Sequence, residues 1–490
     1  MLEAVIANMN SFGRIDICGG MSSYTNLEKQ ASPNTLDIIF KRIMIQGFVC
    51  NDFYTNDFED FMLMTIAYVR AGKLFVLEDI SLGIESIPSA FVRLFRVLIL
   101  SSVANLIAFP FDEFNVFDYG ASGSGQTDDS QAFVNAWRDA CKAETQTARV
   151  IAPRLGSFLL RPIMFLGPCN PRFINFRISG TIIASGSPET WKGLDSSQWI
   201  AFKDVTGLNV YGSGIIDGQG IRWWDQSCRY HPNQKGCTKL APTVFKFLSC
   251  KDCTLSNIYI VNSAQTHVLI SDSKGFNVDN VMIQAPQDSP NTDGIHIHSS
   301  HYVQITNSII GTGDDCISIG DYTSNIDIAN IECGPGHGIS IGSLGKSGGV
   351  VNVEKINIRD SSFKGTTNGA RIKTWQVGKG NIRHITFENL VFDTVDNPII
   401  IDQNYCDVRG KCKEQRTGVK ISDVVYRNLY GTSSSKIAIT LNCSKSVPCS
   451  GITMENINLE PIQPGKEVTA SCINVQGTED GVNPGSCLRN

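Results

Sequence analysis

The sequence is poor in charged residues. Asp, Glu, Lys and Arg make up 18% of its 490 residues, whereas an ordinary soluble domain has about 25%. The formal net charge is -5, so the chain lacks the excess of Lys and Arg that is typical of nucleic-acid-binding proteins. Any acidic ligand would therefore have to be held by a few cations placed locally rather than by the field of the whole molecule.

Histidine is also scarce, which decides how the cysteines are interpreted. The chain has 7 His and 16 Cys, and only Cys18 and Cys50 precede residue 100. Zinc is the alternative to disulfides, but the lone Cys250-x-x-Cys253 has no second half-site. We therefore predict disulfides, an oxidising compartment and no metal site. The predicted pairs each close a short segment, and the other pairings stay open: Cys316–Cys333, Cys443–Cys449, Cys472–Cys487 and Cys228–Cys237.

No apolar run is long enough for a comfortable membrane span. Residues 93–109 place basic residues before about a dozen apolar ones, which resembles the n- and h-regions of a signal peptide. A buried helix is the alternative. We expect a signal-like linker at 92–112 and a secreted, extracellular protein that needs neither a membrane nor a nucleic-acid partner.

The two sides of this linker differ in character. Residues 1–91 read as a short α/β fragment, with an apolar run at 14–18 and helical patterns at 36–47 and 57–72. From residue 113 to residue 490, short β-rich runs recur about every 20–30 residues, with Gly, Asn, Asp or Ser at the breaks. This period predicts an all-β solenoid, a parallel β-helix, with a helix within 128–145 as its N-terminal cap. An antiparallel sandwich is the alternative.

The densest functional signal is a group of three carboxylates. Asp293 lies in Ser289-Pro-Asn-Thr-Asp-Gly294, and Asp314 and Asp315 lie in Gly311-Thr-Gly-Asp-Asp-Cys316. The spacing 314 − 293 = 21 is close to one coil, and residues one coil apart lie on strands about 4.8 Å apart. Such a cluster fits glycoside hydrolysis, because repulsion raises the pKa of at least one carboxyl. Calcium ligation and solvated turn aspartates are the alternatives.

The next coils add cations. His337 follows Asp314 by 337 − 314 = 23 residues and could tune its protonation, although a lone His is more often structural. Arg371 and Lys373 alternate across Ile372 and should point to the same side of a strand. They could grip a substrate carboxylate, or they could merely solubilise the strand face.

At these residues the chain resembles plant polygalacturonases of glycoside hydrolase family 28. Four motifs stand in the order of the family: Asn291-Thr-Asp-Gly294, Gly313-Asp-Asp315, Gly336-His-Gly338 and Arg371-Ile-Lys373. The resemblance covers about 113–490. It implies a right-handed parallel β-helix without metal or cofactor, which hydrolyses α-1,4-linked galacturonan of cell-wall pectin with inversion. We expect the enzyme to be a monomer and to cleave internal bonds.

The resemblance also implies a role for each site residue. Asp314 would be the general acid, supported by His337, while Asp293 and Asp315 would activate water. The implied substrate contacts are Asn291, Arg371, Lys373 and Tyr405.

Three stretches of residues 1–91, at 13–20, 39–43 and 72–80, instead resemble the C-terminal end of a plant 2-alkenal reductase. The fragment contains no G-x-G-x-x-G turn for a dinucleotide, so we expect no redox activity from it. Two further alternatives concern the β-helix. A pectate lyase would use calcium and β-elimination, and a pectin-binding protein would need none of the three carboxylates.

Overall fold

The computed structural model describes residues 14–17, 44–47, 112–231, 237–238, 240–406, 412, 415–485 and 487–488. The chain divides into two units, Met1–Ala108 and Phe109–Asn490. In the first unit, β1 (Arg14–Ile17) and β2 (Met44–Gly47) form a parallel pair, so the helix expected over 36–47 is wrong at its C-terminal end. The helix expected at 57–72 lies outside the described residues, as does the signal-like segment except for its last residue.

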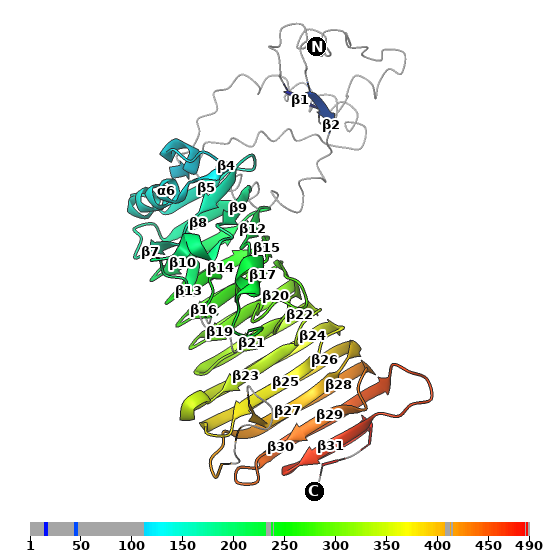
Figure 1. The fold of residues 1–490 in the computed structure, drawn as a ribbon. Helices are drawn as coiled ribbons and strands as arrows, with labels where there is room; N and C mark the ends of the chain where they lie inside the picture. The colour runs from blue at the N-terminus through cyan, green and yellow to red at the C-terminus, as the bar shows by residue number, and fades with distance from the viewer. Residues whose placement is uncertain are drawn as a thin grey trace, which may run out of the picture. The chain divides into compact units, whose positions relative to one another are not determined.

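The second unit is a parallel β-helix, as predicted, in which successive coils stack along one axis (Figure 1). One wall is an 11-stranded sheet. Its strands are β7 (Ile163–Leu166), β10 (Gln198–Lys203), β13 (Thr243–Leu248), β16 (Val268–Ser271), β19 (Ile295–His298), β21 (Ile317–Ile319), β23 (Ile339–Leu344), β25 (Asn368–Trp375), β27 (Asn397–Tyr405), β29 (Ile437–Asn442) and β31 (Thr469–Ile473).

A second sheet of 19 strands forms the other walls. Its strands are β3 (Asp112–Asn115), β4 (Ser124–Asp128), β5 (Thr147–Ala152), β6 (Ser157–Leu160), β8 (Phe173–Ile178), β9 (Thr181–Ala184), β11 (Leu208–Tyr211), β12 (Ile215–Asp217), β14 (Lys251–Ser256), β15 (Tyr259–Val261), β17 (Lys274–Asp279), β18 (Met282–Gln284), β20 (His301–Gly311), β22 (Thr323–Cys333), β24 (Val350–Lys364), β26 (Lys379–Val395), β28 (Lys420–Ser433), β30 (Cys449–Pro461) and β32 (Val475–Asn483). Early coils use two short strands here, such as β17 and β18, and both pair with the longer β20.

Isoleucine ladders hold the middle coils in register. Ile295 pairs with Ile317 and Ile317 with Ile339, all fully buried. A β-branched side chain suits a pleated strand and stacks on its copy in the next coil. Each coil places a ladder residue inside. The positions on either side of it therefore face outward in every coil and lie next to their equivalents in the neighbouring coils.

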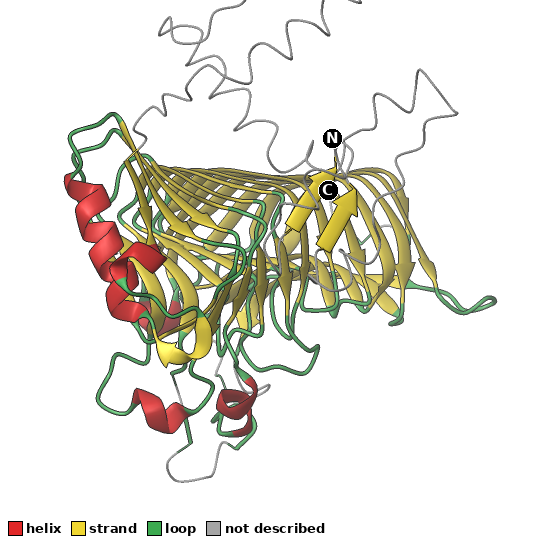
Figure 2. Cartoon of the chain, turned by 90° about the horizontal axis from the view of Figure 1, so that it is seen from above, coloured by secondary structure: helices red, strands yellow, loops and turns green. Residues whose placement is uncertain are grey.

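A helix covers the first coil, where the cap was expected. α6 (Ser130–Lys142) buries Phe133 and Trp137 against the core, and the Trp137 indole donates to the Leu166 carbonyl at 3.0 Å. Figure 2 shows this helix across one end of the coils. Without it the apolar end of the first coil would meet water, which a solenoid cannot tolerate.

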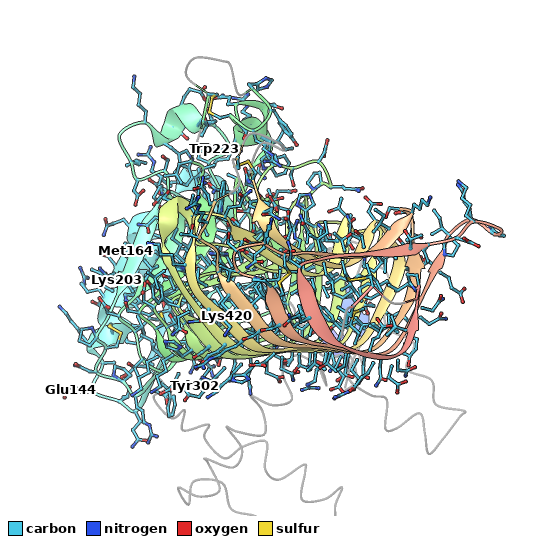
Figure 3. All side chains as sticks on the ribbon, turned by 90° about the horizontal axis from the view of Figure 1, so that it is seen from below. Glu144, Met164, Lys203, Trp223, Tyr302 and Lys420 are labelled. Atoms are coloured by element: carbon cyan, nitrogen blue, oxygen red, sulfur yellow. A yellow bond between two sulfur atoms is a disulfide. The ribbon has the colours of Figure 1, made fainter. Side chains whose placement is uncertain are left out.

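Loops at one corner of the coil lead from the 19-stranded sheet into the 11-stranded sheet. The early ones carry η5 (Pro188–Trp191) and α7 (Ile221–Asp225), where Trp191 and Trp223 pack edge to face at 5.7 Å. Figure 3 places Trp223 in this projecting region. Two short helices lie elsewhere, η4 (Val116–Tyr119) and η6 (Lys346–Gly348). Among the residues described, no helix is long and apolar enough to cross a membrane.

All four predicted disulfides are present, including Cys316–Cys333, which closes the segment beginning just after Asp315. Two further bonds join Cys141–Cys169 and Cys406–Cys412, whose pairing we had left open. Cys250 and Cys253 remain buried free thiols. The disulfide interpretation therefore does not extend to the Cys-x-x-Cys pair, which lies inside the core at 1% exposure for each residue.

Candidate active site

The corner loops place the predicted residues one coil apart. The ladder residues Ile295, Ile317 and Ile339 occupy equivalent positions in three successive coils. The residues two places before them are therefore equivalent too, and these are Asp293, Asp315 and His337. Backbone bonds continue this register, since Gly294 N–H donates to the Asp315 carbonyl at 2.9 Å. The step is therefore 315 − 293 = 22 residues. Within the Asp314/Asp315 pair, Asp315 is the residue in register with Asp293.

Asp314 occupies a bend between β20 and β21, so both neighbouring aspartates can serve one site. Its Oδ1 accepts the Asp315 backbone N–H at 2.9 Å and lies 2.9 Å from His337 Nδ1. Asn291 Nδ2 approaches its Oδ2 at 3.3 Å. The Asp314 side chain keeps 16% of its surface exposed, which leaves it accessible to a ligand.

Asp315 is fixed by two cations. Arg371 Nη2 donates to its Oδ1 at 2.6 Å and Lys373 Nζ to its Oδ2 at 2.8 Å, while Ser340 Oγ also donates to Oδ1. Burial alone would raise the pKa of Asp315, but Lys373 and Arg371 outweigh it and hold that pKa at about 2. Asp315 is therefore a permanent anion at any working pH.

Asp293 has a different environment. Ser318 Oγ donates to its Oδ2 at 2.7 Å and lies 2.7 Å from His296 Nδ1. Surrounding protein raises the pKa of Asp293 well above its usual range, and the nearby Asp314 and Asp315 charges raise it further. Part of its surface still faces solvent. Burial lowers the pKa of His296 to about 4, so this imidazole is neutral and offers Asp293 no charge.

The remaining predicted residues border this cluster. Tyr405 ends β27, and its ring lies 5.6 Å from Lys373 Nζ, so one lysine contacts both Asp315 and the tyrosine. Asn291 is exposed on the corner loop. Every predicted site residue thus belongs to one continuous group.

Three side chains at this site had not been predicted: His296, Ser318 and Ser340. The sequence does contain a signal for them. The three side chains and Arg371 pair in register across neighbouring coils, and each directly follows a residue of the inward ladder. Aligning the coils on the inward ladder would have placed two serines beside the aspartates.

The cluster could in principle hold a cation. Ligand atoms of Asp314, Asp315 and His337 lie within 4.8 Å of one another. However, both oxygens of Asp315 already accept from cationic side chains, which a metal ion would have to displace. The geometry therefore favours an internal ion network over a metal site.

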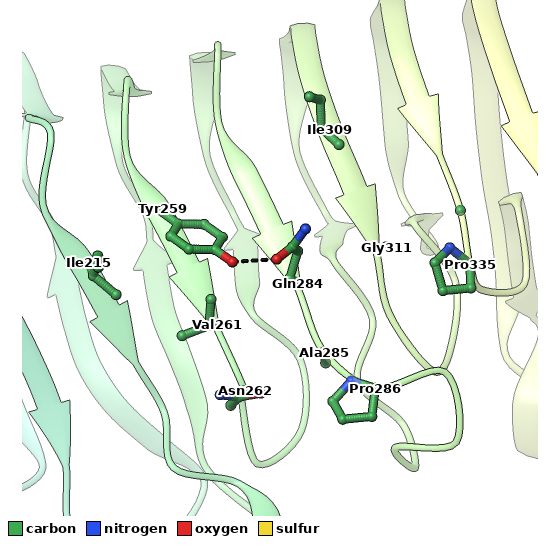
Figure 4. Close-up of a pocket in the computed structure, with 11 residues that line it drawn as sticks. Ile215, Tyr259, Val261, Asn262, Gln284, Ala285, Pro286, Ile309, Gly311 and Pro335 are labelled. Carbon is green, nitrogen blue, oxygen red and sulfur yellow. Dashed lines mark hydrogen bonds between the residues drawn. The ribbon is translucent and has the colours of Figure 1, made fainter.

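A separate hollow lies on the outer face of the 19-stranded sheet. It has a volume of about 500 Å³ and is lined by residues such as Tyr259, Val261, Gln284, Pro286 and Ile309. Figure 4 shows Tyr259 hydrogen-bonded to Gln284 across it. No charged side chain is among its described lining residues, so this hollow lacks the titratable groups that the aspartate cluster contains.

Known proteins agree with this architecture. The family model for glycosyl hydrolases family 28 matches residues 141–487. A polygalacturonase of Persea americana is 44% identical over 366 residues, covering 75% of this chain and 78% of its own. A polygalacturonase of Malus domestica is 43% identical over 379 residues, covering 77% and 80%.

Among solved structures, the polygalacturonase from Erwinia carotovora ssp. carotovora superposes with a TM-score of 0.58 at 26% identity, covering 72% of this chain and 94% of that one. The matched family region contains all three aspartates and the ion network around them. This chain belongs to the glycosyl hydrolases of family 28.

Proposed function

We propose that this protein is a polygalacturonase that hydrolyses α-1,4-galacturonosyl bonds of pectin with inversion. The observation that carries the proposal is a group of three carboxyls, two of which have pKa values shifted in opposite directions, beside two cations suited to an acidic sugar. A cluster of carboxyls in one site fits glycoside hydrolysis, and the opposite pKa shifts of Asp293 and Asp315 give these two different tasks towards water. The pectin-degrading relatives support the choice of substrate.

Asp314 is the proposed general acid, with His337 contacting the same carboxyl. A carboxylate with a pKa near 2 is a weak base, so Asp315 orients the water rather than taking its proton. Asp293, whose pKa is raised, is the stronger base once ionised and accepts that proton. The two water-activating aspartates therefore have distinct tasks.

Arg371, Lys373, Asn291 and Tyr405 are the proposed substrate contacts. Arg371 uses Nε on Ser340 and Nη2 on Asp315, and a guanidinium has five N–H donors. It can therefore hold a substrate carboxylate while it keeps Asp315 ionised. The cleavage site lies in the middle of the 11-stranded sheet, with coils on both sides, which supports attack on internal bonds.

The test is hydrolysis of polygalacturonate by the purified full chain. Reducing ends should appear, proton NMR should show the β-anomer first, and long oligomers should precede monomer. Products absorbing in the ultraviolet would indicate a lyase, and binding without cleavage would indicate a pectin-binding protein. Release of monomer alone would overturn the internal mode of cleavage.

We further propose a secreted, monomeric cell-wall enzyme whose catalytic part begins near residue 113, after a non-functional reductase-like fragment (1–91) and a signal-like linker (92–112). β3 starts at Asp112 and pairs with β5, so a truncation should keep that residue. Removing residues 1–111 should leave specific activity within about twofold, since the coils bury their core on one another. A folded but inactive truncation would contradict this division.

A further inference from the structure

Three neighbouring strands end beside a second pocket on the 11-stranded sheet. β23 ends at Leu344, β25 at Trp375 and β27 at Tyr405. The pocket between them has a volume of about 320 Å³ and is lined by Lys346, Trp375, Gln376 and Tyr405 among others. It thus lies on the sheet whose strands β19 and β21 follow the aspartates.

The pocket is continuous with the aspartate cluster. Lys373 contacts Asp315 at 2.8 Å and lies over the Tyr405 ring at 5.6 Å. Tyr405 meets Trp375 edge to face at 5.4 Å, and Lys346 Nζ lies 5.3 Å from the centre of the Trp375 ring. A row of two ammonium groups and two rings therefore leads from the proposed cleavage site to this pocket.

The loop that carries Lys346 is shaped to bring it there. Gly345 has φ +75°, and a Cβ at this position would lie 2.7 Å from the Gly378 Cα. Two glycines thus let the loop after β23 press against the chain that follows Trp375. The cation–π contact with Trp375 then favours one placement of the Lys346 ammonium.

The chemistry of the lining selects an acidic sugar. Among the lining residues that the structure describes, Lys346 carries the only charge, and the Trp375 and Tyr405 rings supply apolar walls for the C–H face of a sugar ring. Polygalacturonate carries one carboxylate on every sugar, so a chain held at the aspartates presents further carboxylates along this row.

We propose that this pocket is an additional subsite, in which Lys346 binds the carboxylate of a galacturonate unit beyond Tyr405 and Trp375 forms the wall. The proposal rests on the proposed function and deepens it. It makes Lys346 a residue that determines affinity for long, unesterified substrate, with no part in the acid–base steps.

The first experiment compares the wild type with Lys346→Gln on polygalacturonate. At low salt, KM should rise about three- to tenfold with kcat little changed, and the difference should shrink at high salt, where charges are screened. With digalacturonate or trigalacturonate, too short to span the row, the two enzymes should match. Lys420→Gln, which removes an exposed lysine at the start of β28 (Figure 3), is the matched control.

The second experiment measures binding without turnover. Hexagalacturonate is titrated into Asp314→Asn and into Asp314→Asn with Lys346→Gln, followed by tryptophan fluorescence, with Trp375→Leu identifying the reporting indole. Weaker binding upon loss of Lys346 supports the subsite, and equal binding overturns it. Because this readout needs no cleavage, it decides the subsite even if the wild type fails to hydrolyse polygalacturonate, which would overturn only the proposed function.

Discussion

Two adjacent coils place an aspartate at the same register position and give it opposite electrostatics. Asp293 precedes β19, where burial and two neighbouring carboxyls raise its pKa. Asp315 precedes β21, where Arg371 and Lys373 hold its pKa at about 2. Both aspartates stand two residues before a ladder isoleucine, so the difference arises from which side chains the coils further along supply.

The comparison teaches how a solenoid can build an asymmetric site from a repeated unit. Arg371 lies in the same register row as Ser318 and Ser340. Asp293 accepts a hydrogen bond from Ser318, which lies in the next coil. Asp315 accepts one from Ser340 in the next coil and another from Arg371 in the coil after that. A side chain long enough to reach back across Ser340 therefore converts one of two equivalent aspartates into a fixed anion.

The largest expected effect comes from the third carboxyl, Asp314. Asp314→Asn preserves the size of the side chain but cannot protonate a leaving oxygen. We expect kcat to fall about 10²- to 10⁴-fold, with thermal stability nearly unchanged because this side chain is partly exposed. Reducing-end assays and thermal unfolding measure both, and near-normal turnover would remove Asp314 from the mechanism.

Asp315→Asn removes the carboxylate that Arg371 and Lys373 keep ionised, and it should lower the stability of the folded protein. It leaves the half-buried Arg371 and the buried Lys373 without their carboxylate, and removing one partner of a buried pair costs about 3–5 kcal/mol. The pKa of Asp315 is depressed in the folded state, so its contribution is present above the unfolded pKa of about 3.9 and is lost as pH falls towards about 2. The stability difference between wild type and variant, from denaturant unfolding, should therefore be full at pH 6 and shrink at pH 3.

Asp293→Asn should change stability in the opposite direction. A carboxyl with a raised pKa stays protonated in the folded state while it ionises in the unfolded chain, so the wild type loses stability as pH rises above about 3.9 until Asp293 itself ionises. Asparagine removes this penalty. We expect the variant to be inactive yet more stable than wild type at pH 6, with equal stability near pH 3. A variant less stable than the wild type at pH 6 would show that the pKa of Asp293 is not raised in the folded protein.

The sequence supported the fold and the membership of the site better than it supported the contacts within the site. Recurrent β-runs and Gly-rich breaks predicted the coils, and the four motifs contain the three aspartates and the cations that the structure brings together. They did not reveal that the step from Ile295 to Ile317 and from Ile317 to Ile339 is 22 residues, because turns of variable length separate the strands. Nor did the alternation of Arg371 and Lys373 reveal their partner. Alternation fixes the face of a strand, but the carboxylate lies in another coil, 56 residues away for Arg371.

The smallest expected effect tests the hydrogen bond that moderates Asp293. Ser318 Oγ donates to this carboxylate at 2.7 Å and thereby lowers the raised pKa of Asp293. Ser318→Ala removes the donor, so that pKa should rise further and the acidic limb of the kcat profile should move to higher pH, because Asp293 must be ionised to accept a proton. Activity at the optimum should fall about 10- to 100-fold, in line with the loss of about 1.5–3 kcal/mol for one hydrogen bond to a charged group. Ser340→Ala is the matched control: Arg371 and Lys373 still hold Asp315 ionised, so its acidic limb should stay in place. Equal displacement of both profiles would mean that the two aspartates are not electrostatically distinct, and the comparison between the coils would fail.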